Sequence, residues 1–395
     1  MARTGLVGRN FWYCMNPNRP FALLGGLSPQ DFMARHWQKK PLLVRSALAA
    51  PESMLARDDL FALATRQDVQ SRLVRREGRH WRLRHGPLAR RALPPLKQSA
   101  WTLLVQGVDH HVASMHELMG RFRFVPDARL DDAMVSYASD GGGVGAHVDS
   151  YDVFLLQLQG RRRWRIGPAR GDRRLVAGAP LRILAHFQAQ EEYLLQAGDM
   201  LYLPPGYAHE GVAMGPCMTC SIGFRAPALI SLGAELMQHI ADAVLLEPAG
   251  HGEGDVLYAD AGQAATAHPA RLPAALAAFA ERALQSALGD KEALAQALGC
   301  VLTEPKAHVW FQANAAPSKL RGAKGLELDA RTRMLYDAQN IFMNGESWRA
   351  GGADADLMRR LADQRELGLA DLAGASVQAR ALLQEWKEAG WLHGR

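Results

Sequence analysis

Two histidines and an aspartate, in two segments that both resemble β-structure, constrain this chain more than any other feature. His147 and Asp149 lie two residues apart, directly after a glycine-rich stretch. On a strand their side chains would share one face, because side-chain direction alternates along it. His209 follows a strand-like segment that ends in Pro-Pro-Gly. Two imidazoles and one carboxylate form the set that leaves coordination positions open on non-haem Fe(II). The sequence therefore predicts a fold that brings two distant strands to one metal.

The stretch from 131 to 226 is typical of short strands separated by glycine and proline. This spacing predicts an antiparallel sandwich or barrel. A jelly-roll barrel also brings Asp149 and His209, which are 60 residues apart (209 − 149), to one mouth. We therefore expect a mixed β and α protein whose first part is a jelly-roll barrel, that is, a double-stranded β-helix. The expected strands are 133–138, 147–158, 161–166, 192–195, 199–203 and 218–224.

Beyond the barrel the pattern changes twice. Apolar residues recur every three or four positions after 228, which predicts amphipathic helices whose apolar stripe packs internally or against a second subunit. The last part combines two helical stretches with a hairpin around Asn344-Gly345, as a winged helix does. A chain of 395 residues is long enough for several domains. The expected boundaries are 1–20 for an extension, 21–227 for the barrel, 228–317 for the helical region and 318–395 for the winged-helix-like domain.

Charge and cysteine content predict the compartment. The four cysteines, Cys14, Cys217, Cys220 and Cys300, are too few and too scattered for a disulfide framework. No apolar run reaches the roughly 18 residues of a membrane span, and no signal-peptide pattern is present. We therefore expect a cytoplasmic protein with no membrane partner. The net charge of +6 permits transient contact with RNA-rich particles. Direct nucleic-acid binding is not expected, although the sequence leaves it open.

The metal interpretation has alternatives. Each histidine, taken singly, is more often a hydrogen-bonded residue on a barrel rim, and only the combination with Asp149 favours a metal. Zinc or manganese cupins would more often show three histidines and a glutamate, so the set favours Fe(II). Cys217 and Cys220 form a Cys-x-x-Cys pair. Because no second pair accompanies them, buried thiols are the simpler interpretation.

An iron centre of this kind needs an electron donor, usually 2-oxoglutarate, whose distal carboxylate requires a cation inside the barrel. Arg162 alternates with Trp164 and Ile166 on the apolar face of 161–166, so it is expected to point inward. A buried guanidinium needs an anion, and its planar fork suits a carboxylate. The alternative is an internal ion pair with Asp or Glu. Thr219 and Ser221 form the polar face of 218–224 and are expected to line the same pocket, Thr219 at the co-substrate end.

Several strings of residues carry a resemblance to a known family. They are 71–74, 141–154, 160–167, 204–211 and 221–227. Together they resemble the bacterial ribosomal oxygenases of the YcfD type, which have a JmjC fold and depend on Fe(II) and 2-oxoglutarate. The resemblance runs from about Leu24 into the C-terminal part and is most specific between Asp131 and Pro227.

The resemblance implies a dioxygenase that uses Fe(II), 2-oxoglutarate and O2 to hydroxylate the β-carbon (C3) of one arginine in the sixteenth protein of the 50S ribosomal subunit. It also implies a C-terminal winged helix, and a homodimer that forms through the helical region. By position, the iron ligands of the family correspond to His147, Asp149 and His209, and the cation that binds 2-oxoglutarate corresponds to Arg162. The residues that hold the substrate arginine correspond to Asp132, Tyr151 and Ser221.

The substrate residues also suit a guanidinium on physical grounds. Tyr151 would share the strand face of His147 and Asp149, and Asp132 would supply the carboxylate. The alternative for Asp132 is a surface acid at the start of a strand. Two further interpretations stay open. The same chemistry could act on another residue, by histidine hydroxylation or lysine demethylation, because an acid does not separate arginine from lysine. A non-catalytic ribosome-associated protein with a JmjC fold is the other; the complete ligand set and Arg162 argue against it.

Overall fold

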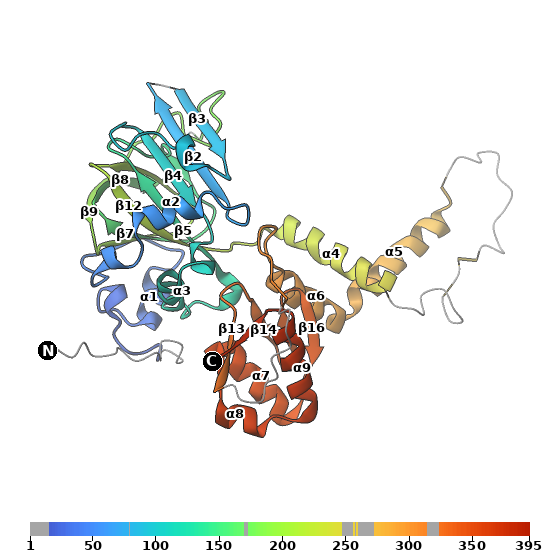
Figure 1. Cartoon of the computed structure of the whole chain (residues 1–395). Helices are drawn as coiled ribbons and strands as arrows, with labels where there is room; N and C mark the ends of the chain where they lie inside the picture. Colours follow the sequence, from blue (N-terminus) through green and yellow to red (C-terminus); the bar gives the residue numbers. More distant parts are fainter. Residues whose placement is uncertain are drawn as a thin grey trace. The chain divides into compact units, whose positions relative to one another are not determined.

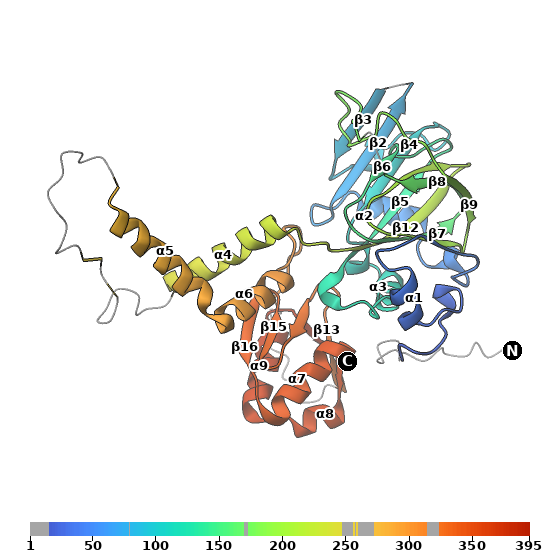
Figure 2. The same ribbon diagram turned by 180° about the vertical axis from the view of Figure 1, so that it is seen from behind.

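The chain divides into two compact units, drawn as ribbons in Figures 1 and 2. The first comprises Met1–Ala226, Lys306–Arg331 and Asp363–Arg395, and the second comprises Pro227–Pro305 and Thr332–Ala362. Most of the predicted extension, Cys14 and the expected domain boundary at 317 lie outside the described residues. No helix in the described ranges combines the length and the apolar character that a membrane crossing requires. The computed structural model describes 16–78, 80–169, 173–246, 256, 258, 259, 272–313 and 324–395.

Twelve strands of the first unit form two antiparallel sheets. They are β1 (Leu42–Val44), β2 (Ser71–Glu77), β3 (His80–His85), β4 (Trp101–Val105), β5 (Leu130–Ala138), β6 (His147–Val148), β7 (Val153–Gln159), β8 (Arg161–Pro168), β9 (Glu191–Gln196), β10 (Met200–Leu203), β11 (Tyr207–Ala213) and β12 (Cys217–Phe224). The larger sheet has the order β1-β10-β7-β12-β5-β4-β2-β3, and the smaller one β6-β11-β8-β9. This arrangement confirms the predicted jelly-roll barrel.

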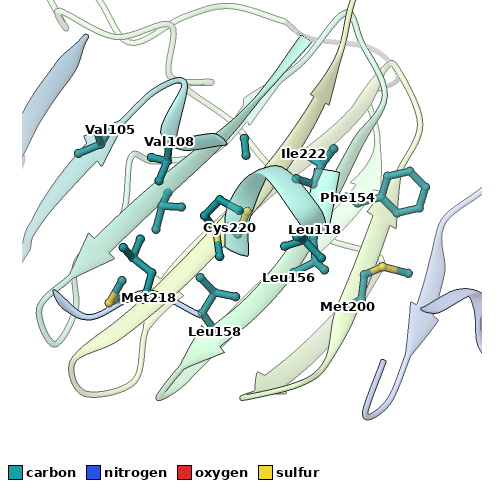
Figure 3. Close-up of a cluster of buried hydrophobic side chains, with 14 of the residues drawn as sticks. Val105, Val108, Leu118, Phe154, Leu156, Leu158, Met200, Met218, Cys220 and Ile222 are labelled. Atoms are coloured by element: carbon teal, nitrogen blue, oxygen red, sulfur yellow. The ribbon is translucent and has the colours of Figure 1, made fainter. Parts of the chain in front are cut away.

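Alternation along the strands separates the core from the pocket. On β12, Met218, Cys220 and Ile222 point into the main hydrophobic cluster together with Leu156 and Leu158 of β7 (Figure 3). Each large aliphatic side chain buried in this way contributes about 1.5–3 kcal/mol. The intervening residues of the same strand face the other way, toward the site. Cys217 and Cys220 are buried free thiols, as predicted, and Cys300 is a buried free thiol as well.

Helices α1 (Pro29–Arg35), α2 (Arg57–Leu63) and α3 (Ala113–Gly120) belong to the same unit. The start of α1 has the capping residues typical of a helix N-terminus. Ser28 is its N-cap and accepts a hydrogen bond of 3.0 Å from the Asp31 amide, while Pro29 occupies the first turn. The helix buries Phe32 against Tyr202, with ring centroids 4.9 Å apart. Short 3-10 turns occur at Ala22–Leu24, Pro51–Ser53, Arg90–Ala92, Val108–His110 and Asp127–Arg129.

Two local predictions in the barrel are wrong. The segment 147–158 is not one strand, because β6 ends at Val148 and β7 begins at Val153. Tertiary hydrogen bonds stabilise the turn between them: Asp152 is fully buried and accepts from the Tyr202 hydroxyl at 2.6 Å and from Gln38 Nε2 at 3.1 Å. His209 does not follow a strand but lies within β11, which the sequence analysis missed.

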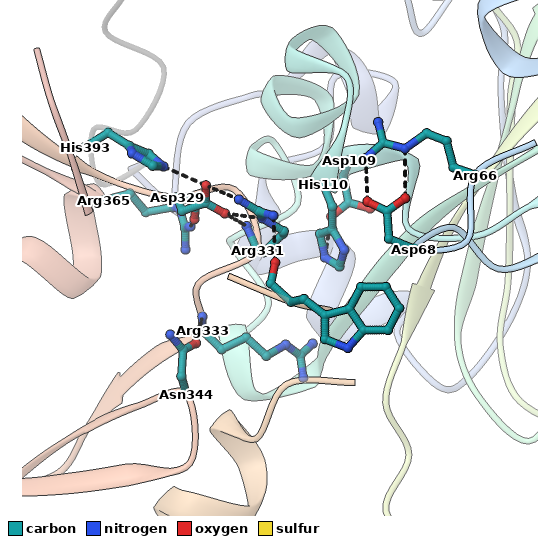
Figure 4. A network of polar contacts seen from close by, with 11 residues as sticks. Arg66, Asp68, Asp109, His110, Asp329, Arg331, Arg333, Asn344, Arg365 and His393 are labelled. Atoms are coloured by element: carbon teal, nitrogen blue, oxygen red, sulfur yellow. Dashed lines mark hydrogen bonds and ion pairs between the residues drawn. The ribbon is translucent and has the colours of Figure 1, made fainter. Parts of the chain in front are cut away.

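The rest of the first unit is a small sheet with two helices. The sheet has the order β17-β13-β18, from Glu366–Gly368, Gly325–Leu328 and Leu392–Gly394. Asp329 directly follows β13 and contacts His393 of β18. Its Oδ1 accepts from Arg331 Nε at 2.7 Å, and its Oδ2 lies 2.7 Å from His393 Nε2 (Figure 4). The helices are α8 (Leu369–Gly374), which was not predicted, and α9 (Val377–Glu388).

The second unit contains α4 (Leu229–Leu246), α5 (Ala274–Gly289) and α6 (Lys291–Thr303), where the periodicity predicted helices. A second small sheet has the order β14-β15-β16, from Met334–Tyr336, Asn340–Met343 and Glu346–Arg349. Its hairpin turns at Asn344 and Gly345, both with positive φ (50° and 93°), which confirms the predicted Asn-Gly turn. Helix α7 (Gly352–Gln364) begins in this unit.

Candidate metal centre and its pocket

The three predicted metal ligands come together on the smaller sheet. His209 of β11 pairs directly with His147 of β6, and the two imidazole centroids are 4.2 Å apart. Asp149 follows β6, and its Oδ2 lies 3.9 Å from His147 Nε2 and 3.6 Å from His209 Nε2. The three ligand atoms lie within 4.8 Å of one another. A single cation between them would therefore meet two imidazoles and a carboxylate.

Backbone carbonyls fix the tautomer of both histidines. His147 Nδ1 lies 3.0 Å from the Gly145 carbonyl, and His209 Nδ1 lies 3.1 Å from the Tyr207 carbonyl. Because a carbonyl oxygen only accepts hydrogen bonds, each Nδ1 carries the hydrogen and each Nε2 keeps its lone pair. Burial, followed by the neighbouring His147, lowers the pKa of His209 to about 3. His209 therefore stays neutral, the protonation state in which an imidazole binds a divalent metal.

Two glycines allow β6 to approach its neighbours. A side chain at Gly143 would place its Cβ 2.5 Å from the Gly211 carbonyl of β11, closer than any real contact. Gly145 has a φ of 80°, and its Cβ would meet Ile183 at 2.9 Å. Glycine avoids both conflicts because it has no Cβ. The glycine-rich stretch therefore lets the first two ligands lie against the strand that carries the third.

A cavity of about 510 Å³ adjoins the ligands and contains every predicted site residue. A volume of this size suits a small co-substrate with one substrate side chain. The eight residues that the sequence predicted are His147, Asp149, His209, Arg162, Thr219, Asp132, Tyr151 and Ser221, and all of them line it.

One end of the cavity holds Arg162 of β8. The guanidinium is buried and donates from Nη1 to Ser136 Oγ at 3.1 Å and Thr219 Oγ1 at 3.3 Å, and from Nη2 to the Gly211 carbonyl at 3.3 Å. Its Nε is buried without a hydrogen-bond partner among the described residues, none of which places a carboxylate within ion-pair distance of it. Burial lowers the pKa of Arg162. A buried cation without a counter-charge fits an anionic ligand.

The other end holds the predicted substrate residues. Asp132 lies in β5 and is buried, so it is not the surface acid of the alternative interpretation. Its Oδ2 accepts from the Gly107 amide at 3.0 Å, and burial raises the pKa of its carboxyl group. Ser221 lies on the pocket face of β12. Tyr151 lines the cavity, but from the turn before β7 and not from a strand, so the alternation argument for it was wrong.

Sequence reasoning missed Ser136, which lines this pocket, and two residues that contact its lining. Ser136 follows Asp132 by four positions on β5, so period-two alternation could have indicated it. Gln157 accepts from Thr219 Oγ1 at 3.0 Å and holds that hydroxyl in place. Lys306 lies 2.8 Å from Asp131 at the substrate end. No sequence signal connects Lys306 with β5, because the two lie far apart along the chain.

Comparisons with known proteins agree with this geometry. Residues 117–232 match the JmjC domain, and residues 283–393 match the ROXA-like winged helix. Barrel, metal set and domain match together define a protein of the JmjC class. The ribosomal protein uL16 3-hydroxylase of Escherichia coli is 39% identical over 240 residues, 61% of this chain and 62% of that protein. This alignment thus covers less than two thirds of the relative.

Solved structures extend the comparison over nearly the whole chain. The X-ray structure of E. coli YcfD has a TM-score of 0.80 at 30% identity and covers 93% of this chain and 98% of that one. A structure of YcfD, described as a ribosomal oxygenase in complex with cobalt and 2-oxoglutarate, has a TM-score of 0.76 at 31% identity with the same coverage. The chain belongs to the family of YcfD-type ribosomal oxygenases.

Proposed function

We propose that this protein is an Fe(II)- and 2-oxoglutarate-dependent dioxygenase that hydroxylates C3 of an arginine in the large-subunit ribosomal protein uL16. The observation that carries the proposal is that one cavity brings together a metal-ligand set, a buried arginine without a counter-charge and a buried aspartate. The uL16 3-hydroxylase name of the E. coli relative supports the substrate.

The metal and the co-substrate would occupy the inner half of the cavity. His147 Nε2, His209 Nε2 and the Asp149 carboxylate would hold Fe(II), and Arg162 would bind the distal carboxylate of 2-oxoglutarate beside Thr219. With O2, these groups supply the oxidation: one oxygen atom enters succinate, CO2 is released, and the other becomes the new hydroxyl group. The E. coli YcfD structure with cobalt and 2-oxoglutarate supports both sites.

The protein's own residues would orient the substrate and exclude water. Asp132 would accept the guanidinium, while Tyr151 and Ser221 would offer hydroxyl groups beside it. Fixing the side chain at its far end leaves C3 free to face the metal, and most of the rate enhancement would come from this positioning. A carboxylate alone does not separate arginine from lysine, so histidine hydroxylation and lysine demethylation remain the alternative activities.

The test is mass spectrometry of ribosomal proteins from cells that lack this gene. The proteins are incubated with the enzyme, Fe(II), 2-oxoglutarate and O2, and His147→Ala serves as the control. We expect one added oxygen on a single arginine of uL16, absent in the control. An added oxygen on histidine, or lost methyl groups on lysine, would replace the proposed substrate. If neither a modified residue nor succinate were detected, the non-catalytic interpretation would be favoured.

We further propose that the protein works as a homodimer in the cytoplasm, where its ribosomal substrate is made. Apolar side chains on α4 support the dimer: Leu229 is 89% exposed, Ile230 86% and Met237 53%. Exposed apolar residues in such a group mark interaction surfaces. Light scattering after gel filtration should give twice the chain mass.

The domain boundaries at 20, 227 and 317 stay predictions, which limited proteolysis would test.

A further inference from the structure

The substrate end of the cavity contains more negative charge than one guanidinium needs. Asp131 and Asp132 are neighbours on β5, and both line the cavity. Asp109 lies close by, and its Oδ1 accepts from the Ala133 amide of the same strand at 2.8 Å. Three carboxylates this close repel one another, and a buried one among them would tend to take up a proton. A protonated Asp132 could not form an ion pair with a substrate cation.

Lys306 supplies the compensating charge. It belongs to the segment that follows α6, and it falls within the same compact unit as β5. Its Nζ lies 2.8 Å from Asp131 Oδ1 and 3.7 Å from Asp132 Oδ2. Arg225 Nε also approaches Asp131 Oδ1, at 3.5 Å. Asp131 therefore has two cations beside it, whereas Asp132 has none within hydrogen-bond distance among the described residues.

The two oxygens of Asp132 have different surroundings. Oδ2 accepts from the Gly107 amide and lies on the side of Lys306. Oδ1 accepts no hydrogen bond from the described residues. Gly223 of β12 lies opposite it and lines the same cavity, and a Cβ at this position would be in van der Waals contact with Oδ1, at 3.8 Å. Oδ1 is thus the oxygen of Asp132 that neither Lys306 nor a side chain at position 223 covers.

We propose that Lys306 is a positioning residue for the cationic side chain of the substrate: it balances the charge of Asp131 and leaves Asp132 Oδ1 to receive the guanidinium. This inference rests on the proposed function. A competing cation would sit on Asp132 itself. Lys306 instead stays beyond hydrogen-bond distance from it and donates to the neighbouring carboxylate.

The charge balance around Asp132 predicts a pH effect. Burial raises the pKa of Asp132, and Asp131 and Asp109 raise it further, while Lys306 and the Gly107 amide lower it. Removing the Lys306 charge should raise this pKa again, so that Asp132 loses its charge at a higher pH. Among the described residues, the titratable and charged groups around Asp132 are Asp131 on β5, Asp109 in Val108–His110, Tyr151 before β7, Cys220 on β12, Lys306, Arg225 beside Asp131 and Arg72 of β2 in the cavity wall.

The experiment compares Lys306→Met, Lys306→Arg and the exposed-lysine control Lys97→Met in the full-length protein, with recombinant uL16 as substrate. For Lys306→Met we expect the KM for uL16 to rise about tenfold, with kcat and the KM for 2-oxoglutarate unchanged. The acid limb of kcat/KM should move to higher pH, because Asp132 takes up a proton more readily once the Lys306 charge is removed. Lys306→Arg should restore most of the loss, and Lys97→Met should behave as wild type.

A separate binding measurement keeps the outcomes distinct. The affinity of uL16 is measured without O2, with Mn(II) and 2-oxoglutarate bound. A wild-type protein that neither binds nor hydroxylates uL16 would overturn the proposed function, and this inference with it. If wild type is active and Lys306→Met leaves the uL16 affinity unchanged, only the inference fails. Tighter uL16 binding by Lys306→Met would show a competing cation and would also refute the positioning role. An equal loss in every kinetic parameter, with a lowered Tm and no rescue by arginine, would show a structural role.

Discussion

Replacing Arg162 with methionine tests the anion site most sharply, because the structure predicts different effects with and without ligand. The buried guanidinium makes three hydrogen bonds but has no carboxylate partner in the described part of the chain. Hydrogen bonds to a charged group contribute about 1.5–3 kcal/mol each, whereas burying an ion costs several kcal/mol. The two effects largely cancel. The free energy of unfolding without ligand should therefore change by no more than about 1–2 kcal/mol.

With 2-oxoglutarate the two proteins should differ clearly. Removing one partner of a buried charge pair costs about 2–5 kcal/mol, so the affinity should fall at least about 30-fold and typically 100-fold or more. At a concentration of 100 times its Kd, a ligand stabilises the wild type by about 2.7 kcal/mol; after a 100-fold loss of affinity the same concentration gives about 0.4 kcal/mol. For a chain of 395 residues that is a Tm rise of about 3 °C for wild type against about 0.5 °C for the variant.

The assay is thermal unfolding with Mn(II), without O2, over a series of 2-oxoglutarate concentrations. Arg161→Met is the matched control, because Arg161 is the neighbouring arginine on the exposed face of β8. It should keep the full ligand-induced shift. If Arg162→Met kept that shift as well, the assignment of Arg162 as the co-substrate cation would be wrong.

Three further changes test other parts of the structure. Asp132→Asn should raise the KM for uL16 about 100-fold and leave 2-oxoglutarate stabilisation intact; equal loss of both would remove Asp132 from the substrate end. Gly143→Ala, whose Cβ would lie 2.5 Å from the Gly211 carbonyl, should destabilise the barrel by about 2–4 kcal/mol in urea unfolding, and an unchanged midpoint would refute the close approach. The hydrogen bond to Asp329 raises the pKa of His393. Its stabilisation should be fully present below about pH 6.5, the ordinary histidine value, and be lost as pH rises through the raised pKa. His393→Gln should remove this dependence in unfolding measured between pH 5 and 9.

Local alternation predicted much of the barrel and the site. The period-two pattern of 161–166 placed Arg162 inside with Trp164 and Ile166, and the structure buries all three. It also separated Thr219 from the core face of β12. These predictions succeed because the direction of a side chain depends only on its own strand.

Features set by distant contacts could not be predicted in this way. The break between β6 and β7 depends on Asp152, whose partners Tyr202 and Gln38 lie on other elements. The strand β11 begins directly after Pro-Pro-Gly, where turn residues obscure its pattern. Lys306 approaches Asp131 only because the chain folds back on itself. In each case the decisive partner lies far away in the sequence.

The carbonyls that orient the two histidines have a consequence for how this centre tolerates sequence change. Gly145 and Tyr207 contribute only main-chain oxygen atoms, which every amino acid possesses. No point mutation can delete such an acceptor, whereas a supporting aspartate or glutamate could be lost in one step. The path of the main chain therefore sets the direction of each imidazole. Sequences that diverge around the ligands can therefore keep the centre intact as long as the turn and the strand persist.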